Sequence, residues 1–573
     1  MPVSTAASAP TPRLVTVNSV NWGNILDFTH LFKGFRLAIN PAKLTIALLA
    51  IMMIYASGRL FDAVWGPQAD RNAIQQYARN PATARRWQAD RERSLSELLS
   101  DDPDVSGSER ERLKSAPREA RKELKKYYTA GFWKALDAAK PTGANSDGRT
   151  GSAGISSAEV EQQSRAAAAR LLLDRMHRLD DVVGHGVFDT FLMYETSQFD
   201  ALVENTLSFV RLTPARNAEP GAPFGSSGGD SQVVSGGLLS RDPDRLWRSD
   251  TVAGCIANMT ITAPRWLFTA AGPMQWRPEN ADTWGGWFKM ISYRALYLAS
   301  LLLLALVSLL ALAFAGASIS RLSALELAGI ERAPLKDVFV FAARRLWVFI
   351  KAPLSPFLIL LAIGLVMALG GMLGAIPLIG PIIIGAMLVI FLGISFVLML
   401  MVLGILGGFN LLYPTIAVEG SDAFDAMSRS FAYAYARPWR LAFYTIVSLV
   451  YGVLTFLFVS FAVYLVLLLT HTFVGWGMDL FGARYGAYSG LPALETIWPS
   501  PRFLQLVQPI NWQAMSWPEY LGALMLFFWV FLLITGIGAY VISYYFSSHT
   551  IMYLLLRRSV DGQQLREVHL DKV

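Results

Sequence analysis

Two stretches, DVFVFAARRLWVFIKAP (Asp337–Pro353) and DAFDAMSRSFAYAYARP (Asp422–Pro438), are copies of one pattern at a constant offset of 85 residues. Each is amphipathic, basic and aromatic-rich, ends in a proline and leads into a long apolar run. A weaker third copy, LFKGFRLAINP, ends at Pro41, with Lys33 at the position of Arg345. Because proline interrupts a helix, each copy predicts an interfacial helix that breaks and turns into the membrane. The repeat predicts three membrane hairpins, each preceded by an elbow.

The composition agrees with a membrane protein. Of 573 residues, 53% are hydrophobic and 16% charged, whereas soluble domains carry about 25% charged residues. Six segments reach the roughly 20 apolar residues that span a bilayer. They are Leu44–Val64, Ile291–Ala317, Leu354–Ala375, Ile382–Leu406, Leu441–Leu469 and Leu521–Ser543. The predicted fold is all-α and polytopic, with six transmembrane helices in three elbow-plus-hairpin units and a helical extramembrane insert between the first two helices.

The charges beside the spans predict the orientation. Lys and Arg collect in short cytoplasmic loops, and here they gather in the N-terminal flank, the second-to-third and fourth-to-fifth loops and the C-terminal tail. The turn IPLIGP (376–381) has none, and the fifth-to-sixth loop has only Arg484 and Arg502. We therefore expect both termini to lie in the cytoplasm. The first apolar stretch, from Leu44, indicates a signal anchor rather than a cleaved signal.

These expectations divide the chain into five regions. They are a disordered cytoplasmic tail (1–26), an elbow with the first transmembrane helix (27–64), an extracytoplasmic helical domain (65–290), transmembrane helices two to six with elbows near 337–353 and 422–438 (291–546), and a cytoplasmic tail (547–573). Within the extracytoplasmic domain, stretches near 141–157 and 217–240 are rich in Gly, Pro and Ser and predict disordered loops.

Two segments of the extracytoplasmic domain have informative patterns. The segment Phe188–Val210 predicts a helix, and roughly one face of it carries Phe188, Phe191, Leu192, Glu195, Phe199, Leu202 and Leu207. Further on, Ala253–Ala271 alternates apolar and small residues and contains Trp266. We interpret it as an interfacial helix beside an outer aromatic belt. A helix in a soluble core is the alternative.

The basic residues predict contacts with lipid rather than nucleic acid. The net charge is +7, but acidic and basic residues balance in the extracytoplasmic domain, so the excess belongs to the membrane module, where anionic headgroups attract it. The candidate headgroup contacts are Arg344, Arg345, Arg429, Arg437 and Arg440, and the candidate structural elbows are Pro41, Pro353 and Pro438. We favour a purely structural elbow without a ligand over a specific headgroup site.

The sequence has no pattern typical of an active site. A single cysteine, Cys255, excludes an intramolecular disulfide. His177 and His185 are eight residues apart and favour a surface cluster over a metal pair. We expect no metal, no cofactor and no enzymatic activity. No ionisable residue lies at the centre of a predicted span, which argues against coupling to protons or sodium.

Three motifs carry a resemblance. They are GASISRLSALELA (Gly316–Ala328), IKAPLSPFLILL (Ile350–Leu361) and YYFSSHTIMYLLLRRSVDG (Tyr544–Gly562). Together with the elbow at Asp422–Pro438, they resemble a family of uncharacterised polytopic membrane proteins from planctomycete-type bacteria, over roughly residues 27–64 and 290–570. That family has no assigned activity, so the resemblance implies a fold and an inner-membrane location only. A fainter likeness is to membrane domains that accompany some glycerophosphodiester phosphodiesterases, without their metal site.

Three functions remain open. The favoured one is a non-enzymatic scaffold that docks a protein partner through its extracytoplasmic domain. The alternative is a transporter, pore or lipid-handling protein without proton or sodium coupling, which would use the space among the hairpins. A membrane enzyme is the third. Nothing in the sequence indicates an oligomeric state.

Overall fold

The computed structural model describes residues 27–66, 69, 73–79, 185–209, 251–275, 283–330, 334–480, 493–503, 506, 515–564 and 567–568. These residues are almost all helical, and the described ranges contain one isolated bridge, between Ala69 and His185. The predicted tail 1–26, the loops near 141–157 and 217–240 and most of the insert lie outside them.

Six helices are long and apolar enough to cross a membrane. They are α3 (Pro41–Trp65), α13 (Trp284–Leu327), α15 (Leu346–Met372), α16 (Gly380–Gly408), α19 (Pro438–Leu480) and α21 (Trp517–Asp561). Each contains one predicted span, apart from the last three residues of Leu354–Ala375, so the chain is an integral multi-pass membrane protein. With 44, 43 and 45 residues, α13, α19 and α21 are about twice the length that a bilayer core requires.

Shorter helices lie at both ends of these six. At one end are η1 (Asp27–Phe32), α2 (Lys33–Ala38), α14 (Leu335–Arg344), η6 (Phe409–Leu411), α17 (Leu412–Glu419) and α18 (Ala423–Ala436). We call this the elbow end. The others are α4 (Ala73–Arg79), α9 (Val187–Phe209), α10 (Val252–Ala257), the π-helical turn η4 (Asn258–Thr262), α11 (Ala263–Thr269), α12 (Gly272–Gln275), η5 (Leu373–Ala375) and α20 (Ala493–Ile497).

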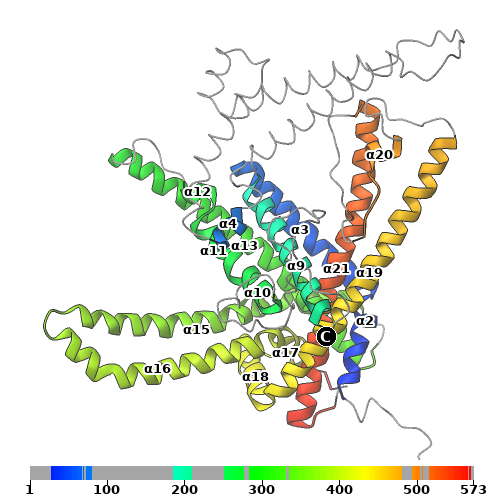
Figure 1. Ribbon diagram of the computed structural model, residues 1–573. Helices are drawn as coiled ribbons and strands as arrows, with labels where there is room; N and C mark the ends of the chain where they lie inside the picture. Colours follow the sequence, from blue (N-terminus) through cyan, green and yellow to red (C-terminus); the bar gives the residue numbers. More distant parts are fainter. Residues whose placement is uncertain are drawn as a thin grey trace, which may run out of the picture.

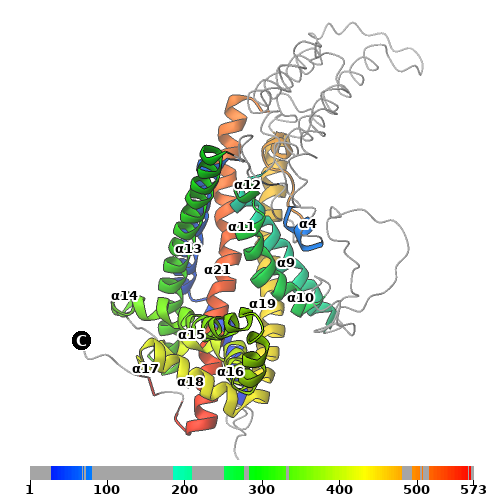
Figure 2. The same ribbon diagram turned by 90° about the vertical axis from the view of Figure 1, so that its left-hand side faces the viewer.

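The long helices do not form three equivalent hairpins. The helices α3 and α13 pack together, as do α19 and α21, and the two pairs diverge away from the elbow end (Figure 1). The hairpin α15–α16 instead leaves the elbow end sideways, across the direction of the other four, and Figure 2 looks along it. The prediction of three similar membrane hairpins is therefore not matched in the second unit.

The hairpin is attached only near its root. There Phe349 and Ile350 of α15 form a buried cluster with Ala313 and Ala317 of α13 and Ile416 of α17. Beyond this root, the most apolar part of α15 has no buried residue, and only 6% of the corresponding part of α16 is buried. Since the root contacts Ala313 and Ala317, in the last turns of the predicted span Ile291–Ala317, the hairpin leaves the bundle where that span meets the elbow end.

The elbow of the second unit differs from the prediction. The helix break lies at Arg345, which separates α14 from α15, whereas Pro353 and Pro356 lie inside α15. Burial of Phe349 and Ile350 holds Leu346–Ala352 in the same helix as the apolar run. Membrane helices tolerate an internal proline because neighbouring groups satisfy the freed carbonyl. Pro353 is therefore part of the repeated sequence pattern, but the chain does not bend there.

The predicted cytoplasmic tail 547–573 is also corrected. The helix α21 continues to Asp561, and Ile551–Leu556 is buried against Leu411, Tyr433 and Tyr444. These apolar residues are covered by the elbow helices rather than by lipid. The last turns of α21 are therefore the central core of the elbow end.

The helices α9 to α11 pack along the bundle instead of forming a separate domain. The helix α9 contacts α3 and α19, and α11 contacts α9 and α4. Trp266 is 1% exposed within a cluster that also holds Phe61, Tyr194 and Tyr297. Within the segment Ala253–Ala271, which the sequence predicts to be an interfacial helix beside an outer aromatic belt, Trp266 is a core residue, whereas Trp284 and Trp287 after it are 87% and 47% exposed.

The direction of the α15–α16 hairpin is testable at its tip. Leu378 is 93% exposed there. In a bilayer crossed by the other four helices, this hairpin lies along the membrane plane, so Leu378→Cys should react with a lipid-soluble maleimide but not with a membrane-impermeant one applied to either side of intact vesicles. Leu480→Cys, at the 83% exposed far end of α19, is the matched positive control, and the unsubstituted chain shows the background from buried Cys255. Labelling of the Leu378→Cys variant by the impermeant reagent would show that the hairpin crosses the membrane.

Candidate functional site: a polar junction at the elbow end

The end of α17 is held by two arginines from other helices. Gly420 terminates α17 in the left-handed conformation, with φ of 66°, which glycine adopts without a steric penalty. Arg321 of α13 donates to the carbonyl of Ala417 at 2.7 Å, and Arg345 donates to the carbonyl of Gly420. Positive charge is favourable at a helix C-terminus. These bonds therefore tie α13 and the α14–α15 break to the end of α17.

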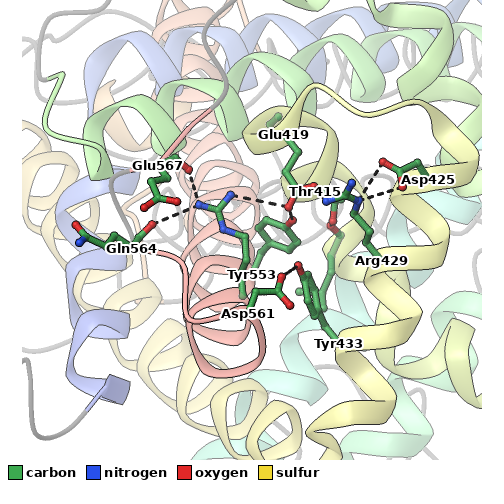
Figure 3. A network of polar contacts seen from close by, with 12 residues as sticks. Thr415, Glu419, Asp425, Arg429, Tyr433, Tyr553, Asp561, Gln564 and Glu567 are labelled. Atoms are coloured by element: carbon green, nitrogen blue, oxygen red, sulfur yellow. Dashed lines mark hydrogen bonds and ion pairs between the residues drawn. The ribbon is translucent and has the colours of Figure 1, made fainter.

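Glu419, the last residue of α17, is the centre of the junction (Figure 3). Its carboxylate accepts a hydrogen bond from the Tyr553 hydroxyl and forms an ion pair with Arg429. Arg557 of α21 lies 3.9 Å from the same carboxylate. Arg557 also donates to the carbonyls of Gln564 and Glu567. One side chain thus joins α17, α18 and α21, with the chain after α21 folded back against them.

A second contact joins α18 to the end of α21. The Tyr433 hydroxyl donates to the carboxylate of Asp561. Burial and this hydrogen bond raise the pKa of Tyr433, so it stays protonated and keeps donating. One turn closer to the start of α18, Ser430 and Thr415 of α17 are 3.0 Å apart, oxygen to oxygen. The α17–α18 corner is therefore fixed by polar contacts on two levels.

A buried ion pair joins the start of α3 to the end of α13. Lys43 Nζ lies 2.9 Å from Glu326 Oε2, and the Lys43 side chain is fully buried. Asn40 donates from Nδ2 to Glu326 Oε1 at 2.5 Å, while its Oδ1 caps α3 by accepting from Ala42 N at 3.1 Å. A buried lysine requires such a partner. The predicted elbow at Pro41 is the first residue of α3 and lies inside this arrangement.

The structure divides the five predicted headgroup residues into two groups. Arg345 and Arg429 belong to the junction, and Arg429 also bonds Asp425 at 3.0 Å. Arg344, Arg437 and Arg440 are exposed. Arg437 immediately precedes Pro438, the first residue of α19. The five arginines therefore do not form one site.

A smaller polar group lies where α9 begins beside the far end of α3. The carboxylate of Asp62 accepts from the backbone N–H of Phe188 and of Asp189, both at 2.9 Å, and so caps α9. Arg59 pairs with Asp189 at 3.0 Å, and His185 lies 3.4 Å from it. The hydrogen bond from His185 lowers the pKa of Asp189. His185, predicted as part of a surface cluster, thus contacts the first turn of α9.

The arrangement at the elbow end is suited to holding helices together. Glu419 contacts two arginines and a tyrosine, so its charge is already balanced. Among the residues that the structure describes, no group of three or more His, Cys, Asp or Glu could hold a metal ion. Sequence reasoning missed Glu419, Arg557, Lys43 and Glu326. In the sequence, each of these residues is a single charge beside an apolar run. Such a charge indicates that a partner of opposite charge is needed, but it does not identify the partner.

Comparisons with protein-family models, with curated proteins and with solved structures gave no match. The resemblance to the planctomycete-type family stays a prediction.

Removing the centre of the junction should destabilise the protein. Glu419→Ala leaves the buried Arg557 without its carboxylate, which costs about 3 kcal/mol for a buried pair. Asp425→Ala removes the other acceptor of Arg429, but Asp425 is 44% exposed, and the loss should be about 0.5 kcal/mol or less. Thermal unfolding of the purified protein in lipid nanodiscs measures both. Equal stability of the two variants would contradict the central role of Glu419.

Proposed function

We propose that this protein is a bacterial inner-membrane scaffold that holds a protein partner on the far side of the membrane from its elbow end. The observation that supports the proposal best is the junction around Glu419. It uses charged side chains to fix segments that are far apart in sequence, including α17, α18 and α21. Such a frame keeps the long helices in fixed places, and with them the described ends of the insert between α3 and α13. A docking protein requires such a frame. The proposal includes no enzymatic activity and no cofactor.

The exposed charges favour a cytoplasmic elbow end. Apart from Arg429 of the junction, the exposed basic residues among the described part of this end are Lys33, Arg36, Lys336, Arg344, Lys351, Arg437 and Arg440. Basic residues near membrane helices favour the cytoplasmic side. Both chain ends then lie in the cytoplasm, and this conclusion holds whether α15–α16 crosses the membrane or lies along it, since a hairpin returns to its own side.

The same end has features of a lipid interface. Trp347 and Trp439 are 63% and 86% exposed, and Lys351 Nζ lies 5.3 Å from the centre of the Trp347 ring. Tryptophan favours the level of the headgroups, and lysine and arginine bind their phosphates. We propose that Arg344, Arg437 and Arg440 contact lipid headgroups there, whereas Arg345 and Arg429 have a structural role.

The orientation predicts the activity of two reporter fusions. A reporter that works only in the cytoplasm should be active when fused after Val573 and inactive when inserted at Ser226 in the insert. A reporter that works only outside should give the reverse pattern. The orientation is decided by measuring both reporter activities in intact cells, with fusion protein levels matched by immunoblot. The opposite pattern at either place would refute the orientation.

The partner surface is testable by deletion within the insert. The chain leaves the described structure after Arg79, at the end of α4, and returns at His185, just before α9. The helix α4 contacts α9, and Ala69, just before α4, pairs with His185 through backbone hydrogen bonds of 3.0 and 2.6 Å. Replacing residues 80–184 with a short Gly/Ser linker should therefore leave the packing of α4 and α9 intact. We expect normal thermal stability and loss of the proteins that crosslink to the full-length chain in native membranes. Retention of the same crosslinked proteins would place the docking surface elsewhere.

A second function, transport or lipid handling, is favoured by a different observation. The helix α9 carries polar side chains alongside α3 and α19, although the six spans lack a central charge. These polar side chains of α9 form a candidate site that has no part in the scaffold role.

A further inference from the structure

The helix α9 reaches the depth of the membrane-spanning helices. Its first turn lies against α3, where a side chain at Gly58 would meet the ring of Phe188 at 2.3 Å. Three turns later, the ring of Phe199 packs edge-on against Phe456 of α19, with 5.3 Å between centroids. Phe456 is near the middle of the predicted span Leu441–Leu469. Figure 1 shows α9 running from the far end of α3 toward the elbow end, where it reaches α19.

Glu195 lies on the face of α9 that points at these two helices. Helical spacing puts Phe188, Glu195 and Phe199 on one face, with Glu195 one turn before Phe199. The carboxylate oxygen Oε1 is buried and has no hydrogen-bond partner among the described residues. A carboxylate in apolar surroundings without a partner is costly, and the neutral acid is favoured there.

A second buried oxygen without a partner lies on α19. Ser460 is 3% exposed, and no described residue bonds its hydroxyl. Along their own helices, Glu195 and Ser460 each lie one turn outward from the Phe199–Phe456 contact. No hydrogen bond joins them.

Other titratable groups on the elements that pack against α9 are engaged elsewhere or exposed. Tyr55 bonds Arg59, Arg59 pairs with Asp189, Tyr77 bonds Thr269, Cys255 accepts from Asn205, Tyr464 packs on Phe503, and Arg265 is exposed. Asp62 is occupied by the first amides of α9. The described surroundings of Glu195 thus supply no cation that would hold it ionised.

We infer that Glu195 is a reversible proton-binding site at membrane depth, because its buried carboxylate oxygen has no partner among the described residues. The prediction that the protein is not coupled to protons or sodium rested on the six spans alone. The helix α9 adds the ionisable group that these spans lack. Buried carboxylic acids inside membranes mark proton pathways. This inference is independent of the scaffold role, because neither the junction nor the insert segment 80–184 takes part in it.

Dicyclohexylcarbodiimide tests the inference, since this apolar reagent attacks protonated carboxyls in apolar surroundings. The acid O–H adds across one C=N bond, and acyl transfer leaves a stable N-acylurea that adds the whole mass of the reagent. With full-length protein in nanodiscs, peptide mass spectrometry should find the adduct at Glu195. Its labelling rate should decline with rising pH, by about tenfold per unit above the pKa of the carboxyl. Glu195→Gln should abolish this adduct, and Glu204→Gln, a change to the same residue type three turns along α9, should not affect it.

Thermal unfolding gives a readout that does not depend on the reagent. A carboxyl that holds its proton more tightly in the folded state stabilises the protein at low pH, and this stability is lost as the pH rises. Glu195→Gln keeps the neutral shape, so its melting temperature should fall less than that of the wild type as the pH is raised, and Glu204→Gln should follow the wild type. Absence of the Glu195 adduct at acidic pH, or a rate that does not change with pH, overturns the inference. Protection by sodium at constant pH and ionic strength also overturns it, because the ligand would then be a metal cation.

Discussion

The cost of leaving a charge buried without a partner determines the elbow end. Glu419 ends α17 with its side chain 12% exposed, and Arg557 of α21 is 4% exposed. Neither could stay in place alone, since an uncompensated buried charge costs several kcal/mol. Their contact, extended by Arg429 and Tyr553, forces α17, α18 and α21 to meet at one point. The apolar core around Ile551–Leu556 then closes beneath that point.

The α15–α16 hairpin shows what happens without such contacts. Its root is held by Phe349 and by the ring of Phe431 over Gly404 and Gly408, where a Cβ would lie 2.6 and 2.7 Å from that ring. Beyond the root, Gly364, Gly385 and Gly393 have open space around them. In Figure 1 no other described helix covers the outer part of the hairpin, so only the contacts at its root set its direction.

The sequence predicts the features that depend on residues close together along the chain. The six apolar helices, the break before Pro438 and the pair Asp425–Arg429 follow from hydropathy, proline chemistry and helical spacing. Pro353 was misleading because its bend is decided by burial of Phe349 against α13, a contact that the local pattern does not contain. The junction was unpredictable for the same reason: Glu419 and Tyr553 are 134 residues apart.

The position of α9 explains why repeated sequence units do not give repeated structure. Hydropathy detects a helix that needs lipid on most sides, whereas a helix packed against protein needs only one apolar face. The face of Phe188 and Phe199 suffices for α9 to lie between α3 and α19, which carries Glu195 to a depth where no span has a charge. The first and third units share this extra layer through their contacts with α9. Among the described residues, the helices of the second unit do not pack against α9 as α3 and α19 do, so they leave the elbow in another direction.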